Sequence, residues 1–289
     1  MACTFTCWPV VGSSIRYWPK MNHLALNQII KTAIFLLILC VRQPISFPVM
    51  TTLLTARPTN ITRSLKKLLG CWKPATQFSS TEHRAIQDVF RRIWADNYWG
   101  NAESRSGGGS SLTQTADLRV SLAAMLQELK ITSMLDLPCG DFHWMKEVAF
   151  CPEMSYVGGD IVDELIINNR LSYASDRFQF ETLNLTTSDL PQVDLVFCRD
   201  CLVHLNINAI QEALCNIKRS KSKLILMTHF TNRRPNQNIE TGQWRPINWT
   251  QSPYNFPPPL QLINEGCSEN DGAFRDKSMA LWNVSDIPT

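Results

Sequence analysis

Residues 131–228 alternate short apolar runs with helical patterns, and this alternation restricts the fold more than any other feature of the chain. Apolar runs predict five strands, at residues 131–137, 155–161, 178–185, 193–198 and 223–228. Helical patterns lie between strands at residues 143–150, 162–172 and 208–218. Such alternation is typical of a mostly parallel sheet with helices on both faces. Later runs at residues 260–267 and 278–284 could close it as an antiparallel pair. We therefore expect an α/β fold around seven strands.

Two amphipathic helices are predicted ahead of the first strand. Ser79-Ser80-Thr81-Glu82 has the pattern of a capping box, and apolar residues follow at helical spacing from Ile86 to Trp94. A second helix is expected over residues 114–129. The glycine-rich stretch between the helices, residues 103–111, either closes over a ligand or is a flexible linker.

The first part of the chain differs from the rest in charge. Nine of the 28 Lys and Arg residues and none of the 25 acids lie within residues 1–81, so the remainder has a net charge of −6. An acidic domain is poorly suited to phosphate backbones, and we expect no nucleic-acid partner. The expected organisation is a leader over residues 1–78 and one domain over residues 79–289.

The leader has three interpretations. Its apolar patch, residues 33–41, is too short to span a bilayer but matches the core of a signal peptide. Residues 51–67 are basic and acid-free, as in an organelle transit peptide. A leader with no role in the fold is the third interpretation. Any membrane contact would come through residues 24–41, and the sequence leaves localisation and oligomeric state open.

Cysteine spacing indicates neither a disulfide scaffold nor a metal site. Ten cysteines are scattered along the chain, and Cys198-Arg-Asp-Cys201 is formally a C-x-x-C motif. No second pair and no histidine pair at zinc spacing accompanies it, so we expect no bound metal.

Polar residues follow three of the predicted strands. The turn after Asp136 contains Gly140, which lets a ligand approach the backbone closely. Asp160 lies twenty residues further on, about the spacing at which an acid binds ribose hydroxyls. Asp200 and His204 follow the fourth strand. Ligands of parallel sheets bind at these carboxyl ends, so we expect a site there. Taken singly, Asp136 could instead cap the turn, Asp160 could cap the following helix, and His204 could be a packed histidine.

These motifs resemble those of the class I S-adenosylmethionine (SAM)-dependent methyltransferases, and most closely one poorly characterised family among them. The resemblance runs from about Ile86 to the C-terminus. It rests on Trp99-Gly100 with Glu103-Ser-Arg-Ser-Gly, Asp136-Leu-Pro-Cys-Gly-Asp-Phe, Phe197-Cys-Arg-Asp-Cys-Leu-Val-His-Leu, Thr241-Gly-Gln-Trp-Arg-Pro-Ile-Asn and Asp276-Lys-Ser. It implies a Rossmann-like, seven-stranded, mostly parallel sheet of the class I type. A nicotinamide oxidoreductase is the weaker alternative, since its G-x-G-x-x-G pattern is absent from this turn.

The resemblance implies roles for particular residues. Asp136, Cys139 and Gly140 would hold the methionine part of SAM, and Asp160 the ribose. Asn184 stands where an Asp commonly contacts the adenine, and its side-chain oxygen could accept from the adenine amino group. Pro138 and Phe142 occupy positions that are often glycine, so this turn departs from the usual pattern.

Methyl transfer needs positioning and, for a hydroxyl acceptor, a base. His204 and Asp200 are the candidates, and His204 is favoured because its ordinary pKa is near neutrality. Arg199 pairs with Asp200 or holds an anionic substrate.

The acceptor pocket is expected beneath residues 229–259, a stretch rich in Pro and Trp. Trp244 and Arg245 would bind a small polar or glycan acceptor, methylated at oxygen; the alternative is a stiff loop packed over the sheet. A catalytically inactive SAM-binding protein or assembly factor is the competing function. Asn184 and the sparse glycines favour it, whereas Asp136, Gly140, Asp160 and His204 favour an enzyme.

Overall fold

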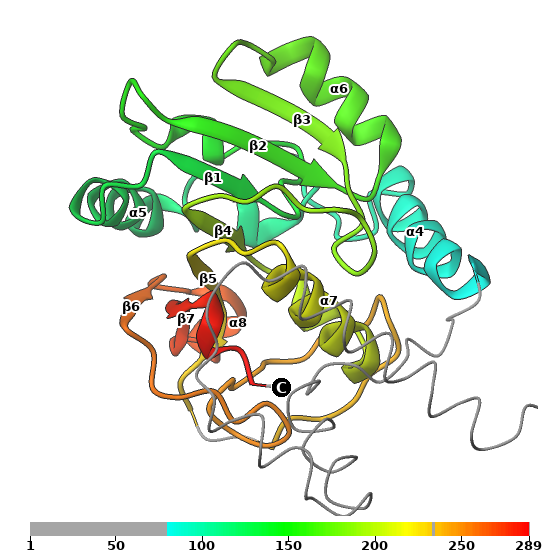
Figure 1. Ribbon diagram of the computed structural model, residues 1–289. Helices are drawn as coiled ribbons and strands as arrows, with labels where there is room; N and C mark the ends of the chain where they lie inside the picture. Colours follow the sequence, from blue (N-terminus) through cyan, green and yellow to red (C-terminus); the bar gives the residue numbers. More distant parts are fainter. Residues whose placement is uncertain (1–79, 233–234, 289) are drawn as a thin grey trace, which may run out of the picture. The chain divides into compact units, whose positions relative to one another are not determined.

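The computed structural model describes residues 80–232 and 235–288, with side chains from residue 84 onward (Figure 1). The predicted leader, its apolar patch and the side chains of the predicted capping box lie outside this part of the chain. Within it, no helix is long and apolar enough to cross a membrane.

All seven predicted strands are present and form one sheet. Their order is β3-β2-β1-β4-β5-β7-β6, and β7 runs antiparallel to both of its neighbours while the other pairings are parallel. The strands are β1 Ser133–Asp136, β2 Ser155–Asp160, β3 Phe178–Thr182, β4 Leu195–Cys198, β5 Leu224–Phe230, β6 Gln261–Asn264 and β7 Lys277–Asn283. The predicted fold class, including the antiparallel closing pair, is confirmed.

Helices cover both faces of this sheet. They are α4 Ser80–Ala95, α5 Ala116–Glu128, α6 Asp163–Tyr173, α7 Ile207–Arg219 and the one-turn α8 Glu269–Gly272. Successive strand residues point to opposite faces. Leu135 of β1 therefore belongs to the core cluster that contains the apolar residues of α7, whereas Met134 belongs to the cluster that contains those of α5 and α6.

The helix predicted over residues 143–150 is not formed. Only a single 3₁₀ turn, Met145–Glu147, connects β1 to β2 at this point. Phe142 has a positive φ of 57° and is buried with Trp144 and Met145 in one core cluster. Packing of these large side chains into the core fixes the segment as an irregular loop, an effect that helical periodicity does not reveal.

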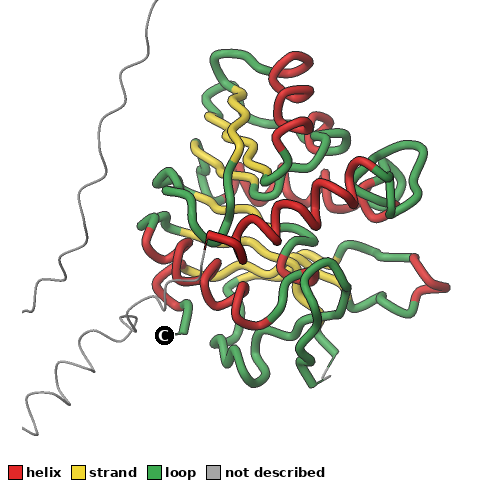
Figure 2. The backbone as a smooth tube through the Cα atoms, turned by 90° about the vertical axis from the view of Figure 1, so that its right-hand side faces the viewer, coloured by secondary structure: helices red, strands yellow, loops and turns green. Residues whose placement is uncertain are grey.

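The order in which successive strands are added to the sheet reverses between β1 and β4. The chain builds β1, β2 and β3 outward to one side and then returns to place β4 on the other side of β1. The carboxyl ends of β1 and β4 therefore form the topological switch point, where open α/β sheets bind their ligands. Helix α4 crosses in front of the strands in Figure 2, which views them from this side.

Candidate active site

A cleft lies at the carboxyl ends of the strands, with an empty volume of about 1140 Å³ including the part open to solvent. Helix α4, the glycine-rich loop and the segments after β1 to β4 line it. Eight of the ten predicted site residues are among the lining residues: Asp136, Cys139, Gly140, Asp160, Asn184, Arg199, Asp200 and His204.

The turn after β1 is shaped by Gly140. Its φ of +54° lies in the left-handed region that favours glycine, and an added Cβ would collide with Ser106 Oγ. Its N–H donates to Asp160 Oδ2 at 3.3 Å, and Cys139 Sγ lies 3.7 Å from Asn169 Nδ2. The turn is thus held between the ends of two strands, the glycine-rich loop and α6.

Asp160 is buried at the end of β2. Its Oδ1 accepts the N–H of Val162 at 3.0 Å, while Oδ2 accepts that of Gly140. Burial raises the pKa of Asp160 to about 6, against the effect of these backbone hydrogen bonds. The backbone N–H of Ile161 is a third contact, and since the two carboxylate oxygens have four lone pairs, the carboxylate retains capacity for a ligand hydroxyl.

Asp136, at the end of β1, is buried beside the same turn. Tyr156 Oη donates to its Oδ2 at 2.6 Å. Burial raises the pKa of Asp136 to about 8, although the Tyr156 hydrogen bond acts in the opposite direction. The carboxyl is therefore largely protonated at neutral pH. Sequence reasoning missed Tyr156, which pairs with Met134 in the register of β1 with β2 and reaches Asp136 two residues further along β1.

Asn184 lines the cleft, but its side-chain oxygen is already engaged. Oδ1 accepts from the Thr186 N–H at 2.9 Å and from Thr186 Oγ1 at 2.7 Å. A carbonyl oxygen has two lone pairs. An adenine amino group would therefore have to displace one of these bonds, which the sequence-based role for Asn184 did not foresee.

The glycine-rich loop is fixed over the turn after β1. Asp141 accepts from Ser104 Oγ at 2.9 and 3.0 Å, from the Arg105 N–H at 2.9 Å and from Ser106 Oγ at 3.3 Å. At its far end, the carbonyl of Gly109 accepts from Arg199 at 2.9 Å. Of the two interpretations of this loop, closure over the cleft agrees with these contacts.

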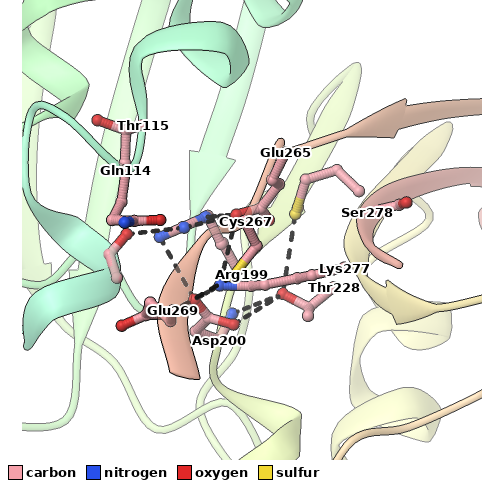
Figure 3. Close-up of polar contacts among 12 residues, drawn as sticks. Gln114, Thr115, Arg199, Asp200, Thr228, Glu265, Cys267, Glu269, Lys277 and Ser278 are labelled. Atoms are coloured by element: carbon pink, nitrogen blue, oxygen red, sulfur yellow. Dashed lines mark hydrogen bonds and ion pairs between the residues drawn. The ribbon is translucent and has the colours of Figure 1, made fainter. Parts of the chain in front are cut away.

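Four charged side chains form a cluster beneath the β4 end of the cleft (Figure 3). Arg199 and Glu265 pair at 2.6 Å, and Lys277 and Asp200 pair at 2.6 Å. Cross-contacts of 3.4 Å join Arg199 to Asp200 and Lys277 to Glu265. Burial opposes ionisation of Asp200, but the charges of Lys277 and Arg199 outweigh it and hold its pKa far below the usual range. Asp200 is accordingly a weak base, contrary to its predicted role.

His204 has the properties of a neutral base. Its Nδ1 lies 2.9 Å from the carbonyl oxygen of Gln243, which only accepts, so Nδ1 carries the proton and Nε2 a lone pair. Burial lowers the pKa of His204, although the Gln243 contact opposes this. The Trp99 ring lies against the imidazole, with centroids 5.1 Å apart and planes at 34°.

The predicted substrate residues Trp244 and Arg245 do not line the cleft. Arg245 is buried and donates to the carbonyls of Leu202 and Leu205 at 2.9 and 2.7 Å, so it anchors the segment after β4. Trp244 packs edge-on against Phe274 with a centroid distance of 4.8 Å. Both predictions are wrong in the same way, because these side chains hold the covering segment in place. The Trp99 side chain lines the cleft instead.

The described residues contain no candidate metal site and no disulfide bond between Cys198 and Cys201. No group of three or more His, Cys, Asp or Glu side chains there could hold a metal ion. Cys198 and Cys201 are both free thiols.

Comparisons with known proteins match the chain at the level of structure only. No family model matches it, and neither does any curated protein sequence. Magnesium protoporphyrin IX methyltransferase from Synechocystis PCC 6803, solved with bound SAM, is 12% identical over 72% of this chain and 99% of that one, with a TM-score of 0.49. Human N-acetylserotonin methyltransferase in complex with SAM is 14% identical over 72% and 67%, with a TM-score of 0.40. The methyltransferase domain of bacterial CtHen1 is 14% identical over 41% and 66%, with a TM-score of 0.36. Because these identities and scores are low, the function is argued below from the site itself.

Proposed function

We propose that the chain is a SAM-dependent methyltransferase that methylates an oxygen of a small acceptor, a polar molecule or a glycan. One observation carries the proposal. A single cleft combines the Gly140–Asp160 turn with a neutral histidine whose Nε2 has no hydrogen-bond partner among the described residues.

The residues of the turn fit SAM. Gly140 offers backbone without a side chain, and the Asp160 carboxylate keeps a lone pair for a ribose hydroxyl beyond its three backbone contacts. Asp141 adds a second carboxylate near the turn, which suits a cationic sulfonium. Bound there, SAM would supply an activated methyl group.

The chain's own part in the reaction is to position and deprotonate the acceptor. The Gln243 carbonyl fixes the His204 tautomer, so Nε2 takes the proton of an acceptor hydroxyl as the oxygen is methylated. The closed loop over residues 103–111 excludes water. Asp200, held by Lys277, adds a fixed negative charge beside His204 that stabilises the imidazolium formed.

A SAM-binding assembly factor without turnover is the second candidate. The engaged oxygen of Asn184 favours it, because weaker adenine binding is more easily tolerated where no reaction depends on it. A nicotinamide oxidoreductase is disfavoured by the single glycine in the β1 turn.

Calorimetric titration of the full chain with SAM, and with NAD as the cofactor control, tests the proposal. We expect a dissociation constant on the order of micromolar for SAM and no binding of NAD. Asp160→Ala should abolish SAM binding while circular dichroism remains unchanged. Trp244→Ala, outside the cleft, is the matched control and should bind normally. A folded protein that does not bind SAM would refute the proposed function.

A further inference from the structure

The cleft has a distinct acceptor end, and its position follows from the strand order. The residues that fit the cofactor follow β1, β2 and β3, whereas Asp200 and His204 follow β4 on the other side of the switch point. If the proposed function holds, the acceptor therefore binds beside His204.

Apolar and aromatic side chains form the walls of this end. The Trp99 ring lies against His204 with its plane tilted by 34°, and an added Cβ on Gly107 would lie 3.3 Å from Trp99 Cβ, at the base of the side chain. The Gly242 N–H donates to the His204 carbonyl at 2.8 Å, and a Cβ on Gly242 would touch Val89 of α4. This turn of α4 thus stands next to His204. From α4, the side chains of Ile86 and Phe90 line the cleft.

The charged groups that follow β4 at this end are already paired. Asp200 is bound by Lys277 at 2.6 Å and Arg199 by Glu265 at 2.6 Å. Ser110 Oγ is 3.5 Å from the carbonyl of Ser106. Two groups at this end have no hydrogen-bond partner among the described residues: His204 Nε2, which can accept, and the Trp99 indole N–H, which can donate.

The chemistry of these walls favours one class of acceptor over the others. A sugar would bring several hydroxyl groups against walls that are mostly apolar and aromatic, and buried unpaired hydroxyls are unfavourable. An anionic acceptor would meet the Asp200 carboxylate, and the two cations beside it, Arg199 and Lys277, are already paired. A flat aromatic ring with one hydroxyl would stack on Trp99, fill the space beside Phe90 and direct its oxygen at His204.

We propose that the acceptor is an aromatic alcohol, bound by stacking on Trp99 and deprotonated by His204 Nε2. Phenolic hydroxyls have pKa values near 10, as in Tyr, which brings them within reach of an imidazole base. The acceptor oxygen forms a bond to the methyl carbon, the carbon–sulfur bond breaks with its electron pair left on sulfur, and the proton passes to Nε2. This narrows the acceptor of the proposed function and excludes glycans.

The test uses the full chain with SAM and two probes, 2-naphthol and methyl β-glucoside, with methyl ethers detected by mass spectrometry. We expect 2-methoxynaphthalene and no methylated glucoside. Trp99→Ala should raise KM for 2-naphthol about tenfold or more, by loss of a stacking contact. Trp99→Phe should restore most of the loss, and Trp244→Ala should have no effect.

Other results separate the two proposals. Methylation of the glucoside in preference to 2-naphthol would overturn the aromatic acceptor and leave the methyltransferase function standing. Failure of 2-naphthol to be methylated, and to bind the protein saturated with S-adenosylhomocysteine, would also overturn it. Absence of SAM binding would remove the proposed function and this inference with it.

Discussion

His204 is the residue on which the proposed chemistry depends. Imidazole acts as a base only when neutral, and its lowered pKa keeps it neutral to lower pH than an exposed histidine. We therefore expect kcat/KM to stay level as the pH falls through 6.5 and to decline only at more acidic pH. His204→Ala should reduce kcat roughly 10²- to 10⁴-fold and remove this acid limb. SAM titration should show an unchanged dissociation constant.

A matched control for this substitution is His143→Gln. His143 Nε2 lies 2.9 Å from Glu103 at the surface of the domain, outside the cleft lining, and glutamine can keep that contact. Its kinetic constants should be close to those of the parent protein. Full turnover by His204→Ala would show that another group takes the proton.

Asp136 makes the stability of the fold depend on pH. Its carboxyl holds a proton up to a pKa of about 8 when folded, whereas the unfolded chain releases it near pH 4. Between these values the folded state binds more protons, so stability falls as pH rises. Asp136→Asn keeps an acceptor for Tyr156 but cannot ionise. Thermal unfolding should show equal Tm values at pH 5 and a higher Tm for the variant at pH 8.5.

Asp194 provides a control, because its pKa is shifted in the opposite direction to that of Asp136. Burial opposes its ionisation, but Lys223 at 2.7 Å and the hydrogen bonds of Thr132 and Ser133 hold its pKa well below the usual range. Asp194→Asn should therefore lower Tm at both pH values. An Asp136→Asn variant that is less stable at pH 8.5 would contradict the assigned burial effect.

Some site residues are predictable from the sequence and others are not. The two groups differ in the sequence distance to the features that place them at the cleft. Asp136, Asp160 and His204 each follow a recognisable strand, so their place at the cleft is predictable. Lys277 is 77 positions from Asp200 and Glu265 is 66 from Arg199. No motif contains Glu265, and the Asp276-Lys-Ser motif contains Lys277 without giving it a role, because only the antiparallel edge of the sheet brings these two residues to Arg199 and Asp200.

At the scale of elements, the glycine-rich loop is the part of the site whose closure is easiest to test. Asp141 accepts from three residues of this loop, and such charge-assisted hydrogen bonds are stronger than neutral ones. Asp141→Ala should release the loop, so trypsin should cleave after Arg105 at least about tenfold faster. Peptide mapping over time measures this rate, and SAM should bind more weakly in calorimetry.

Glu147→Ala is the control for the loop variant, since Glu147 is an exposed acid on the neighbouring 3₁₀ turn. Its cleavage rate should match that of the parent. Equal cleavage in Asp141→Ala would mean that other contacts, such as those of Arg105 with the Trp94 carbonyl and of Arg199 with Gly109, keep the loop closed.

The central strands β1, β4 and β5 were predictable because apolar runs of four to seven residues are buried on both faces of a parallel sheet. The segment after β1 was not, because its aromatic residues have helical spacing but pack as a loop. Phe142 alone contacts Tyr156, Tyr173, Phe178 and Phe180, with ring centroids between 5.1 and 5.9 Å apart. Tertiary packing of this kind overrides local periodicity.

At the scale of the whole domain, the charged cluster joins the cleft end of β4 to the antiparallel edge of the sheet. Arg199 and Asp200 follow β4, Glu265 follows β6, and Lys277 begins β7. Positive and negative groups alternate, so each charge has two opposite neighbours. The position of the Asp200 carboxylate beside His204 therefore depends on strands at the far end of the chain.

Removing one charge from this cluster should destabilise the entire domain. Glu265→Gln leaves two buried cations with Asp200 alone, and breaking a buried pair in this way costs about 3–5 kcal/mol of unfolding free energy. Urea unfolding measures the loss. Combining Glu265→Gln with Lys277→Met rebalances the charges and should recover part of it. Asp88→Asn breaks an exposed pair with Arg91 at 3.9 Å and should change stability by less than about 1 kcal/mol. A loss for Glu265→Gln no greater than for Asp88→Asn would show that the cluster does not tie the two parts of the sheet together.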